Sequence, residues 1–271
     1  MMFERGIEIK TPAQIETMRA AGLVVAETLE VLRESAVAGV TTRELDAIAH
    51  EHIRSRGASS NFLGYHGFTG VICTSVNDEV VHGIPGSRVL RDGDIISIDC
   101  GAVVDGWHGD AATTVAIGDV PDEVLALMRV TEESMWRGIA AARLGGRVSD
   151  ISHAIETTIV GAGDYGIVEG FTGHGIGSQM HQPPDVHNYG KPRRGAKLVK
   201  GLALAVEPMV TLGTSSTRIL DDDWTAVTTD GSWAAHYEHT FTLTDNGAWV
   251  LTALDGGKTR LAELGVPYGG D

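Results

Sequence analysis

The first sixty residues carry apolar side chains at helical spacing in two stretches. Thr11-Pro12 is a typical helix start, and apolar residues then recur every three or four positions to about residue 35. A second stretch of the same kind starts at Thr41 or Thr42 and stops at Gly57. The sequence therefore predicts two consecutive helices ahead of the first strands.

The next part of the chain has the composition of β-strands. Residues 71–76 and 94–114 are rich in β-branched residues, and Asp105-Gly106 is a strong signal for a tight hairpin. A turn centred there pairs Asp110 with Gly101 and makes Asp99 its diagonal neighbour. The two carboxylates then lie on one face of the sheet, about 7–8 Å apart at Cα and within reach of a shared cation.

The same order of elements occurs again in the second half. Pro121 opens a third helix that extends to about Leu144, Ser149 or Asp150 starts a fourth, and strands are predicted around residues 171–174, 202–211 and 236–243. This order predicts one α+β domain over residues 1–271, with similar halves at about 10–118 and 121–251 facing a central site. The last seven residues, 265–271, are predicted to form a frayed tail.

Composition narrows the classes of function. Hydrophobic residues make up 42% of the chain and the formal net charge is −15, which argues against binding to DNA or to an anionic membrane. No apolar run is long enough to span a bilayer, and the first ten residues lack the apolar core of a signal peptide. Two cysteines are too few for a disulfide framework, so a reducing cytoplasm is expected.

Three further residues stand in settings that are unusual for surface side chains. His174 lies among glycines in TGHGIG, Glu207 lies in the apolar segment AVEPM, and Glu238 begins a predicted strand in YEHT. Each alone has an ordinary structural explanation, such as an ion pair or a strand end. Together with Asp99 and Asp110 they make four carboxylates and one imidazole, which can hold two divalent cations in a nearly neutral buried site. Such ligands suit Co²⁺, Mn²⁺ or Fe²⁺, with Zn²⁺ as an alternative, and a pair of these ions can activate water for peptide hydrolysis.

Six motifs identify a known family. In chain order, GYHGF, VNDEVVHGIPG, SIDCGAVVDGWHGDAATT, GHGIG, VEPM and YEHT closely resemble those of bacterial type I methionine aminopeptidases, in a variant similar to that of actinobacteria. The resemblance extends from Ile7 to Leu251. It implies the pita-bread fold, with two pseudo-symmetric halves around a dimetal site. It also implies removal of the initiator methionine when the second residue is small and uncharged, with metal ligands Asp99, Asp110, His174, Glu207 and Glu238.

The resemblance assigns further roles around these ligands. His82 matches the histidine near the substrate amide and leaving group, His181 matches the one that contacts the scissile carbonyl, and Glu207 would also act as general base. The implied methionine pocket consists of Phe62, Tyr65, Phe68, Cys73, Met180 and Trp224. Phe62, Phe68 and Met180 depart from residues seen in relatives, which affects the shape of the pocket and not the reaction. His187 and His239 receive no role.

Two other functions are compatible with this fold. A prolidase or Xaa-Pro aminopeptidase usually carries a large additional N-terminal domain, for which this chain is too short. A binding protein that has lost its metals would have lost ligands, and all five are present. The expected protein is a monomeric cytoplasmic enzyme that acts on the N-termini of nascent polypeptides. Its basic run Lys191–Lys200 is typical of a solvated loop, with contact to the ribosome as the alternative interpretation.

Overall fold

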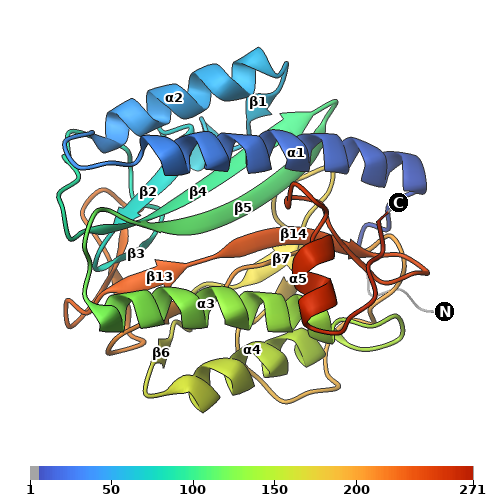
Figure 1. Cartoon of the computed structure of the whole chain (residues 1–271). Helices are drawn as coiled ribbons and strands as arrows, with labels where there is room; N and C mark the ends of the chain where they lie inside the picture. The colour runs from blue at the N-terminus through green and yellow to red at the C-terminus, as the bar shows by residue number, and fades with distance from the viewer. Residues whose placement is uncertain (1–5, 271) are drawn as a thin grey trace.

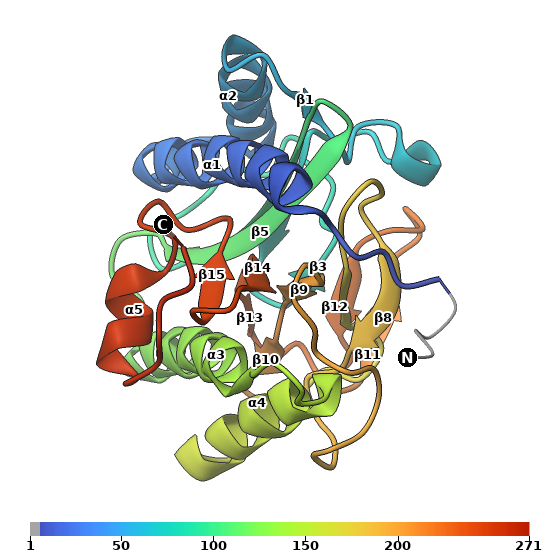
Figure 2. The ribbon, with the colours of Figure 1, turned by 90° about the vertical axis from the view of Figure 1, so that its right-hand side faces the viewer.

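The computed structural model describes residues 6–270 as a curved sheet with helices on its outer side (Figure 1). Helices α1 (Pro12–Ser35) and α2 (Thr42–Ser55) lie over the first half of the chain's strands, and α3 (Asp122–Ala141) and α4 (Val148–Ala162) lie over the second half. In Figure 2 the two helix pairs stand at opposite sides with the strands between them. The α+β architecture predicted from the repeated order of elements is therefore present.

Fifteen strands lie within residues 6–270. In chain order they are β1 (Ser59–Ser60), β2 (Ile72–Val76), β3 (Glu79–Val81), β4 (Ile95–Val104), β5 (Trp107–Ala116), β6 (Gly166–Ile167), β7 (Gly173–Gly175), β8 (Gln182–Val186), β9 (Ala203–Val206), β10 (Met209–Thr211), β11 (Thr217–Ile219), β12 (Ala226–Thr228), β13 (Ala234–His236), β14 (Glu238–Leu243) and β15 (Ala248–Val250). The largest sheet has the order β1-β4-β5-β14-β9-β7-β8, with β2 paired to β4 and β15 to β14. Because β5 pairs with β14, the two halves form one continuous sheet.

The two faces of the large sheet have different surroundings, because one face packs against the helices and the other does not. Ile96, Ile98 and Cys100 alternate along β4 and pack in one apolar cluster with residues of α1 and α2. The intervening positions of β4, including Ser97 and Asp99, therefore point to the opposite side. A second cluster joins α3 and α4 to β9 and β14 in the same way. The helices thus cover the outer face, and the inner face carries the polar residues.

Local signals predicted the starts of α1 and α2 correctly, but not the start of α4 or the end of α3. Thr11 and Thr41 form capping boxes with Gln14 and Glu44, as expected for residues at these positions. Helix α4 begins at Val148, ahead of the predicted start, because the Asp150 side chain accepts the backbone N–H of Arg147 at 2.8 Å. Helix α3 ends at Ala141 and not near residue 144, because the following loop pairs with the backbone of residue 198.

Two predicted strands are each broken into two in the structure. Residues 202–211 form β9 and β10, separated at Glu207-Pro208, and residues 236–243 contribute to β13 and β14, separated at Tyr237. Strands β9 and β14 pair in the large sheet, whereas β10 and β13 pair in a smaller sheet, β13-β10-β6. Pro208 has no N–H to continue the ladder. The break frees Glu207 from regular pairing at the point where it meets the site.

The predicted frayed tail is wrong for the residues that the structure describes. Tyr268 bridges to Ala248, and the Gly269 N–H donates to the Ala248 carbonyl at 2.7 Å. Gly247 permits this docking, because a Cβ there would lie 2.1 Å from the Pro267 carbonyl oxygen. A short helix, α5 (Lys258–Glu263), precedes the tail and was not predicted. The expectations for residues 1–5 and for residue 271 lie outside the described residues, and the boundary between the two halves stays a prediction.

Lys10 is a buried cation in the segment that leads into α1. It is 5% exposed, and its Nζ donates to the Glu8 carbonyl at 3.1 Å and to Gln182 Oε1 at 3.4 Å. Burial lowers the pKa of this amine from 10.5 to about 8, against the opposing effect of the Glu8 carboxylate. The charged form of Lys10 is therefore less favourable in the folded protein than in the unfolded chain.

This shift predicts a pH dependence of stability. Between about pH 8 and 10.5 the unfolded chain keeps a proton that folded Lys10 has released, so stability rises with pH in this window. The free energy of unfolding of the wild type should therefore increase there relative to that of Lys10→Met. Denaturant titrations at closely spaced pH values measure this, with the exposed Lys258→Met as control. Parallel curves for the wild type and Lys10→Met would show that the shift is absent.

Candidate active site

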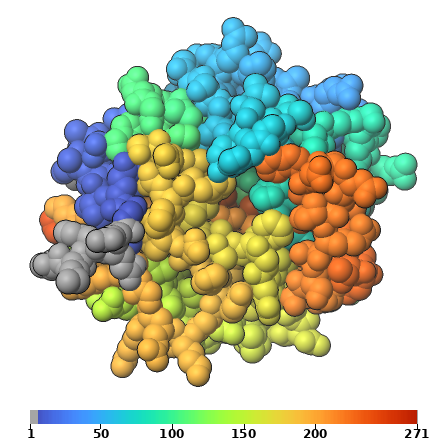
Figure 3. All heavy atoms as spheres, turned by 180° about the vertical axis from the view of Figure 1, so that it is seen from behind, coloured from blue at the N-terminus to red at the C-terminus, as the bar shows by residue number. Residues whose placement is uncertain are grey.

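One cavity gathers the residues singled out from the sequence. Its volume is about 340 Å³, and on the face opposite that of Figure 1 the surface is hollowed between segments coloured cyan, yellow and orange (Figure 3). The lining residues are Phe62, Tyr65, His66, Phe68, Cys73, His82, Asp99, Asp110, His174, Met180, His181, Glu207, Trp224 and Glu238. All thirteen predicted site residues are in this set. His66 is the additional member.

Strand register explains why three of the acids share one face. Gly101 pairs with Asp110 and Asp99 pairs with Ala112, which is the register predicted from the Asp105-Gly106 turn. Ala112 also pairs with Glu238 on the next strand. Paired residues and residues two apart on a strand point to the same side of a sheet. Asp99, Asp110 and Glu238 therefore project together from β4, β5 and β14.

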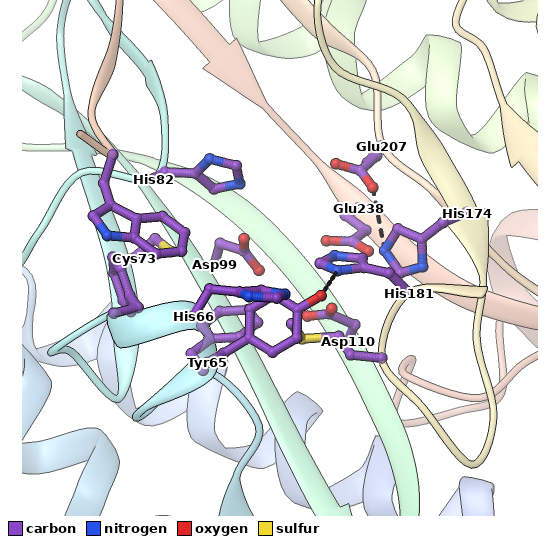
Figure 4. Close-up of a pocket in the computed structure, with 14 residues that line it drawn as sticks. Tyr65, His66, Cys73, His82, Asp99, Asp110, His174, His181, Glu207 and Glu238 are labelled. Carbon is purple, nitrogen blue, oxygen red and sulfur yellow. Dashed lines mark hydrogen bonds and ion pairs between the residues drawn. The ribbon is translucent and has the colours of Figure 1, made fainter. Parts of the chain in front are cut away.

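The other two candidate ligands come from strands further along the same sheet. His174 lies in β7, and Glu207 directly follows β9. His174 Nε2 lies 3.5 Å from Glu207 Oε1, and Figure 4 shows both side chains directed toward the three acids. His174 Nδ1 is 3.0 Å from the Gly175 carbonyl oxygen, which only an Nδ1–H can satisfy. Nε2 is then left with a free lone pair, as a metal ligand requires. Glycine at position 173 permits this close packing, since a Cβ there would lie 2.4 Å from a backbone oxygen of β9.

The five side chains create an electrostatic problem for the protein alone. The four acids are only 2–9% exposed. Burial raises the pKa of Asp99 to about 7, and burial together with the neighbouring carboxylates raises the pKa of Asp110, Glu207 and Glu238. Burial also lowers the pKa of His174 to about 3, so its imidazole is neutral. Asp99 Oδ1, Asp110 Oδ1 and Glu238 Oε1 have no hydrogen-bond partner among the described residues.

This set of donors fits divalent cations. Mutually repelling buried carboxylates with free oxygens need positive charge, and one neutral imidazole completes an oxygen-rich site. Ligand atoms of Asp110, His174 and Glu238 lie within 4.8 Å of one another, and so do those of Glu207, His236 and Glu238. Glu238 belongs to both groups. Asp99, one of the predicted ligands, lies outside both groups.

Two histidines near the site, His236 and His66, were not predicted from the sequence. His236 stands two residues before Glu238 and is 1% exposed. Because the strand was predicted to start at His236, same-face spacing with Glu238 was a signal that could have pointed to it. His66 adopts a left-handed backbone with φ of 46° at the cavity wall. It lies within the motif GYHGF, which is the signal that could have pointed to it.

His82 and His181 lie on different sides of the acids (Figure 4). Burial lowers the pKa of His82 to about 4, with a further effect from His181, so its imidazole is neutral at pH 7. Its φ of 62° is strained for a residue with a side chain. At the cavity rim, His181 Nδ1 lies 2.8 Å from the Tyr65 hydroxyl. Partial burial and the nearby His66 lower the pKa of His181, although its ring remains accessible to solvent.

An apolar pocket adjoins the acids. Phe62, Phe68, Cys73 and Met180 form a separate buried cluster, with Tyr65 and Trp224 packed against it. Cys73 on β2 pairs with Asp99 on β4, so the floor of the pocket and the first acid are neighbours. Burial and the charge of Asp99 raise the pKa of the Cys73 thiol, which stays neutral. A side chain bound in this pocket therefore holds its own backbone beside the acids.

Comparison with known proteins assigns the family. The family model described as metallopeptidase family M24 matches residues 16–245, which include every candidate ligand. The chain belongs to this family. It is 51% identical over 250 residues to a methionine aminopeptidase of Clostridium acetobutylicum, covering 92% of this chain and 100% of the relative. It is 50% identical over 254 residues to methionine aminopeptidase 1 of Mycobacterium tuberculosis, covering 92% and 96%.

Solved structures of M24 proteins confirm the pita-bread fold. A methionine aminopeptidase from Thermotoga maritima matches with a TM-score of 0.89 and 42% identity, over 91% of this chain and 99% of that one. A prolidase from Pyrococcus furiosus matches with a TM-score of 0.71 and 22% identity, over 65% of its length, which shows the fold alone. The predicted resemblance to methionine aminopeptidases is therefore confirmed, and the chain is a metallopeptidase homologue of that group.

Proposed function

We propose that this chain removes N-terminal methionine from polypeptides whose second residue is small and uncharged, using two divalent ions. The observation that carries the proposal is the junction of an apolar, sulfur-lined pocket with four buried carboxylates through the pairing of Cys73 with Asp99. A flexible thioether side chain suits such a pocket. The proposed ligands are Asp99, Asp110, His174, Glu207 and Glu238.

The chain's own residues supply positioning and proton transfer. When bound, such ions lower the pKa of a water molecule and polarise a carbonyl group. Glu207 would accept the proton of the attacking water, because its carboxylate lies at the cavity wall. Co²⁺, Mn²⁺ and Fe²⁺ are the candidate ions, with Zn²⁺ as an alternative. Their identity and number belong to this proposal.

Two neutral histidines act on the reacting amide. In the proposal the Tyr65 hydroxyl donates to His181 Nδ1, so His181 Nε2 carries the proton and donates to the carbonyl oxygen as negative charge develops. His82, across the acids from His181 in Figure 4, assists the departing amide nitrogen. Both roles need a neutral imidazole at pH 7, which the lowered pKa of each ring supports.

The substrates, the location and the oligomeric state of the protein are also part of the proposal. Its substrates would be the N-termini of new polypeptides in the cytoplasm, and the protein would act as a monomer. Along residues 191–200 the four basic side chains up to position 197 are exposed, and Lys200 pairs with Asp245, as in a solvated loop. Contact of this loop with the ribosome is the alternative interpretation of the same residues. Among residues 6–270, no helix has the length and apolarity to cross a membrane.

The specificity of hydrolysis tests the proposed function. We expect kcat/KM for Met-Ala-Ser to exceed that for Leu-Ala-Ser by about 10–200-fold. This is the range for a small change in an apolar side chain that binds in a hydrophobic pocket. Met-Lys-Ser should be a poor substrate, because the second residue meets the cavity wall. The measurement is kcat/KM on these peptides and on Ala-Pro, together with metal analysis of protein purified without added metal. Efficient cleavage of Ala-Pro or of N-terminal leucine would contradict the proposal.

A further inference from the structure

His236 is a buried histidine that faces a proposed metal ligand. Its Nε2 lies 3.7 Å from Glu207 Oε2. The residue is 1% exposed, and this nitrogen has no hydrogen-bond partner among the described residues. A buried polar atom without a partner is costly, so its direction toward a carboxylate oxygen calls for an explanation.

The backbone of His236 is held firmly on two sides. Its N–H donates to Thr114 Oγ1 at 3.0 Å, and Thr114 Oγ1 is 2.8 Å from the His236 carbonyl oxygen. His236 also pairs with Met209, two residues beyond Glu207 along the chain. These contacts fix the backbone of His236 relative to both β5 and the segment that carries Glu207. The imidazole therefore starts from a fixed point beside the Glu207 side chain.

Glu207 lies between two imidazoles that have different roles. Its Oε1 is 3.5 Å from His174 Nε2, and its Oε2 is 3.7 Å from His236 Nε2. His174 offers a lone pair, because its Nδ1 is engaged by a backbone carbonyl. Among the described residues, the cavity wall includes His174 and Glu207 but not His236. His236 therefore stands behind the carboxylate, on the side away from the substrate space.

We propose that His236 is a positioning residue that donates Nε2–H to Glu207 Oε2. A movement of about 0.7 Å brings the two atoms to a normal hydrogen-bond distance of about 3.0 Å. The bond turns Glu207 Oε1 toward His174 and the acid cluster, and it gives the buried Nε2 its partner. The inference rests on the proposed function, because it matters only where Glu207 binds an ion. Partners of this kind orient carboxylate ligands in metal sites.

Three variants test this role through metal affinity. His236→Leu removes the donor at similar volume, His236→Gln keeps an N–H donor at a similar reach, and His239→Gln changes a partly buried histidine that contacts Thr252 and Trp136 instead. We expect His236→Leu to weaken Co²⁺ binding by about 10–100-fold. His236→Gln should recover most of that loss, and His239→Gln should bind like the wild type. The measurements are calorimetric titration with Co²⁺ and thermal unfolding of the metal-free proteins.

The possible results separate the alternatives. Unchanged Co²⁺ affinity in His236→Leu, even with a lower melting temperature, would reduce His236 to a structural residue and overturn the proposal. Equal losses in His236→Leu and His236→Gln would overturn the donor role. If paramagnetic NMR showed one fewer Co²⁺-bound imidazole in His236→Leu than in the wild type, His236 would be a ligand instead. Failure of the wild type to bind Co²⁺ or cleave Met-Ala-Ser would refute the proposed function itself.

Discussion

Asp110→Asn is expected to abolish peptide hydrolysis and to reduce bound metal while making the metal-free protein more stable at pH 8. Asp110 belongs to the group of His174 and Glu238, and an amide cannot replace its charge. The loss of activity should exceed the roughly 10–100-fold loss that is typical when a residue hydrogen-bonded to a metal ligand is changed. The gain in stability follows from the raised pKa of Asp110, which burial and the charges of Glu238 and Asp99 cause.

The pH dependence of this effect has a definite sign. Unfolded Asp110 loses its proton near its ordinary pKa of 3.8, whereas the folded protein retains it to higher pH. The folded state therefore binds more protons in this window, and its stability falls as pH rises above 4. The stability advantage of metal-free Asp110→Asn over the wild type should grow over the same range. Thermal unfolding from pH 4 to 8 measures it.

Asp105→Asn is the matched control for this prediction. Asp105 lies in the turn of the same hairpin, with a left-handed φ of 47° that asparagine tolerates well. It is exposed and outside the cavity wall, so metal content and activity should stay at wild-type values. Wild-type rates that survived exhaustive chelation would contradict the dependence on metal. Equal activity in Asp110→Asn would remove Asp110 from the ligands.

His181→Ala is expected to lower kcat by about 10²–10³-fold, or roughly 2.7–4 kcal/mol, with metal content unchanged. In the proposed role the imidazole donates to an oxygen that becomes negative only in the transition state, so KM should change little. His181 approaches His174 edge to face, with ring centroids 4.4 Å apart, and its Nδ1 is engaged by the Tyr65 hydroxyl. Kinetic constants and metal content of the same preparation are the measurements.

His187→Ala is the control for His181, since the two histidines flank β8 at its opposite ends. His187 is exposed, packs near Tyr189 and lies outside the cavity wall, so its loss should leave kcat and metal content unchanged. Two results would change the assignment of His181. A loss of metal would place it among the ligands, and an increase in KM at constant kcat would place it in the binding wall.

The sequence by itself determined the local parts of this site. The Asp105-Gly106 turn set the register of β4 and β5, because turn geometry fixes which residues face each other, and this placed Asp99 and Asp110 on one side. Side-chain caps at Thr11 and Thr41 determined the starts of the first two helices for the same local reason. Six motifs indicated the family without any structural information.

Only the tertiary structure decided how distant segments meet. The predicted strands that contain Glu207 and Glu238 each break into two, because one part pairs in the large sheet and the other in a smaller sheet, and this pairing depends on partners far away in the chain. The placement of His236 behind Glu207 follows from this break and was not predicted. The C-terminal tail docks because Gly247 leaves room for a backbone that arrives twenty residues later. Pairing between remote strands is a property of the whole packed sheet, and local pattern alone does not specify it.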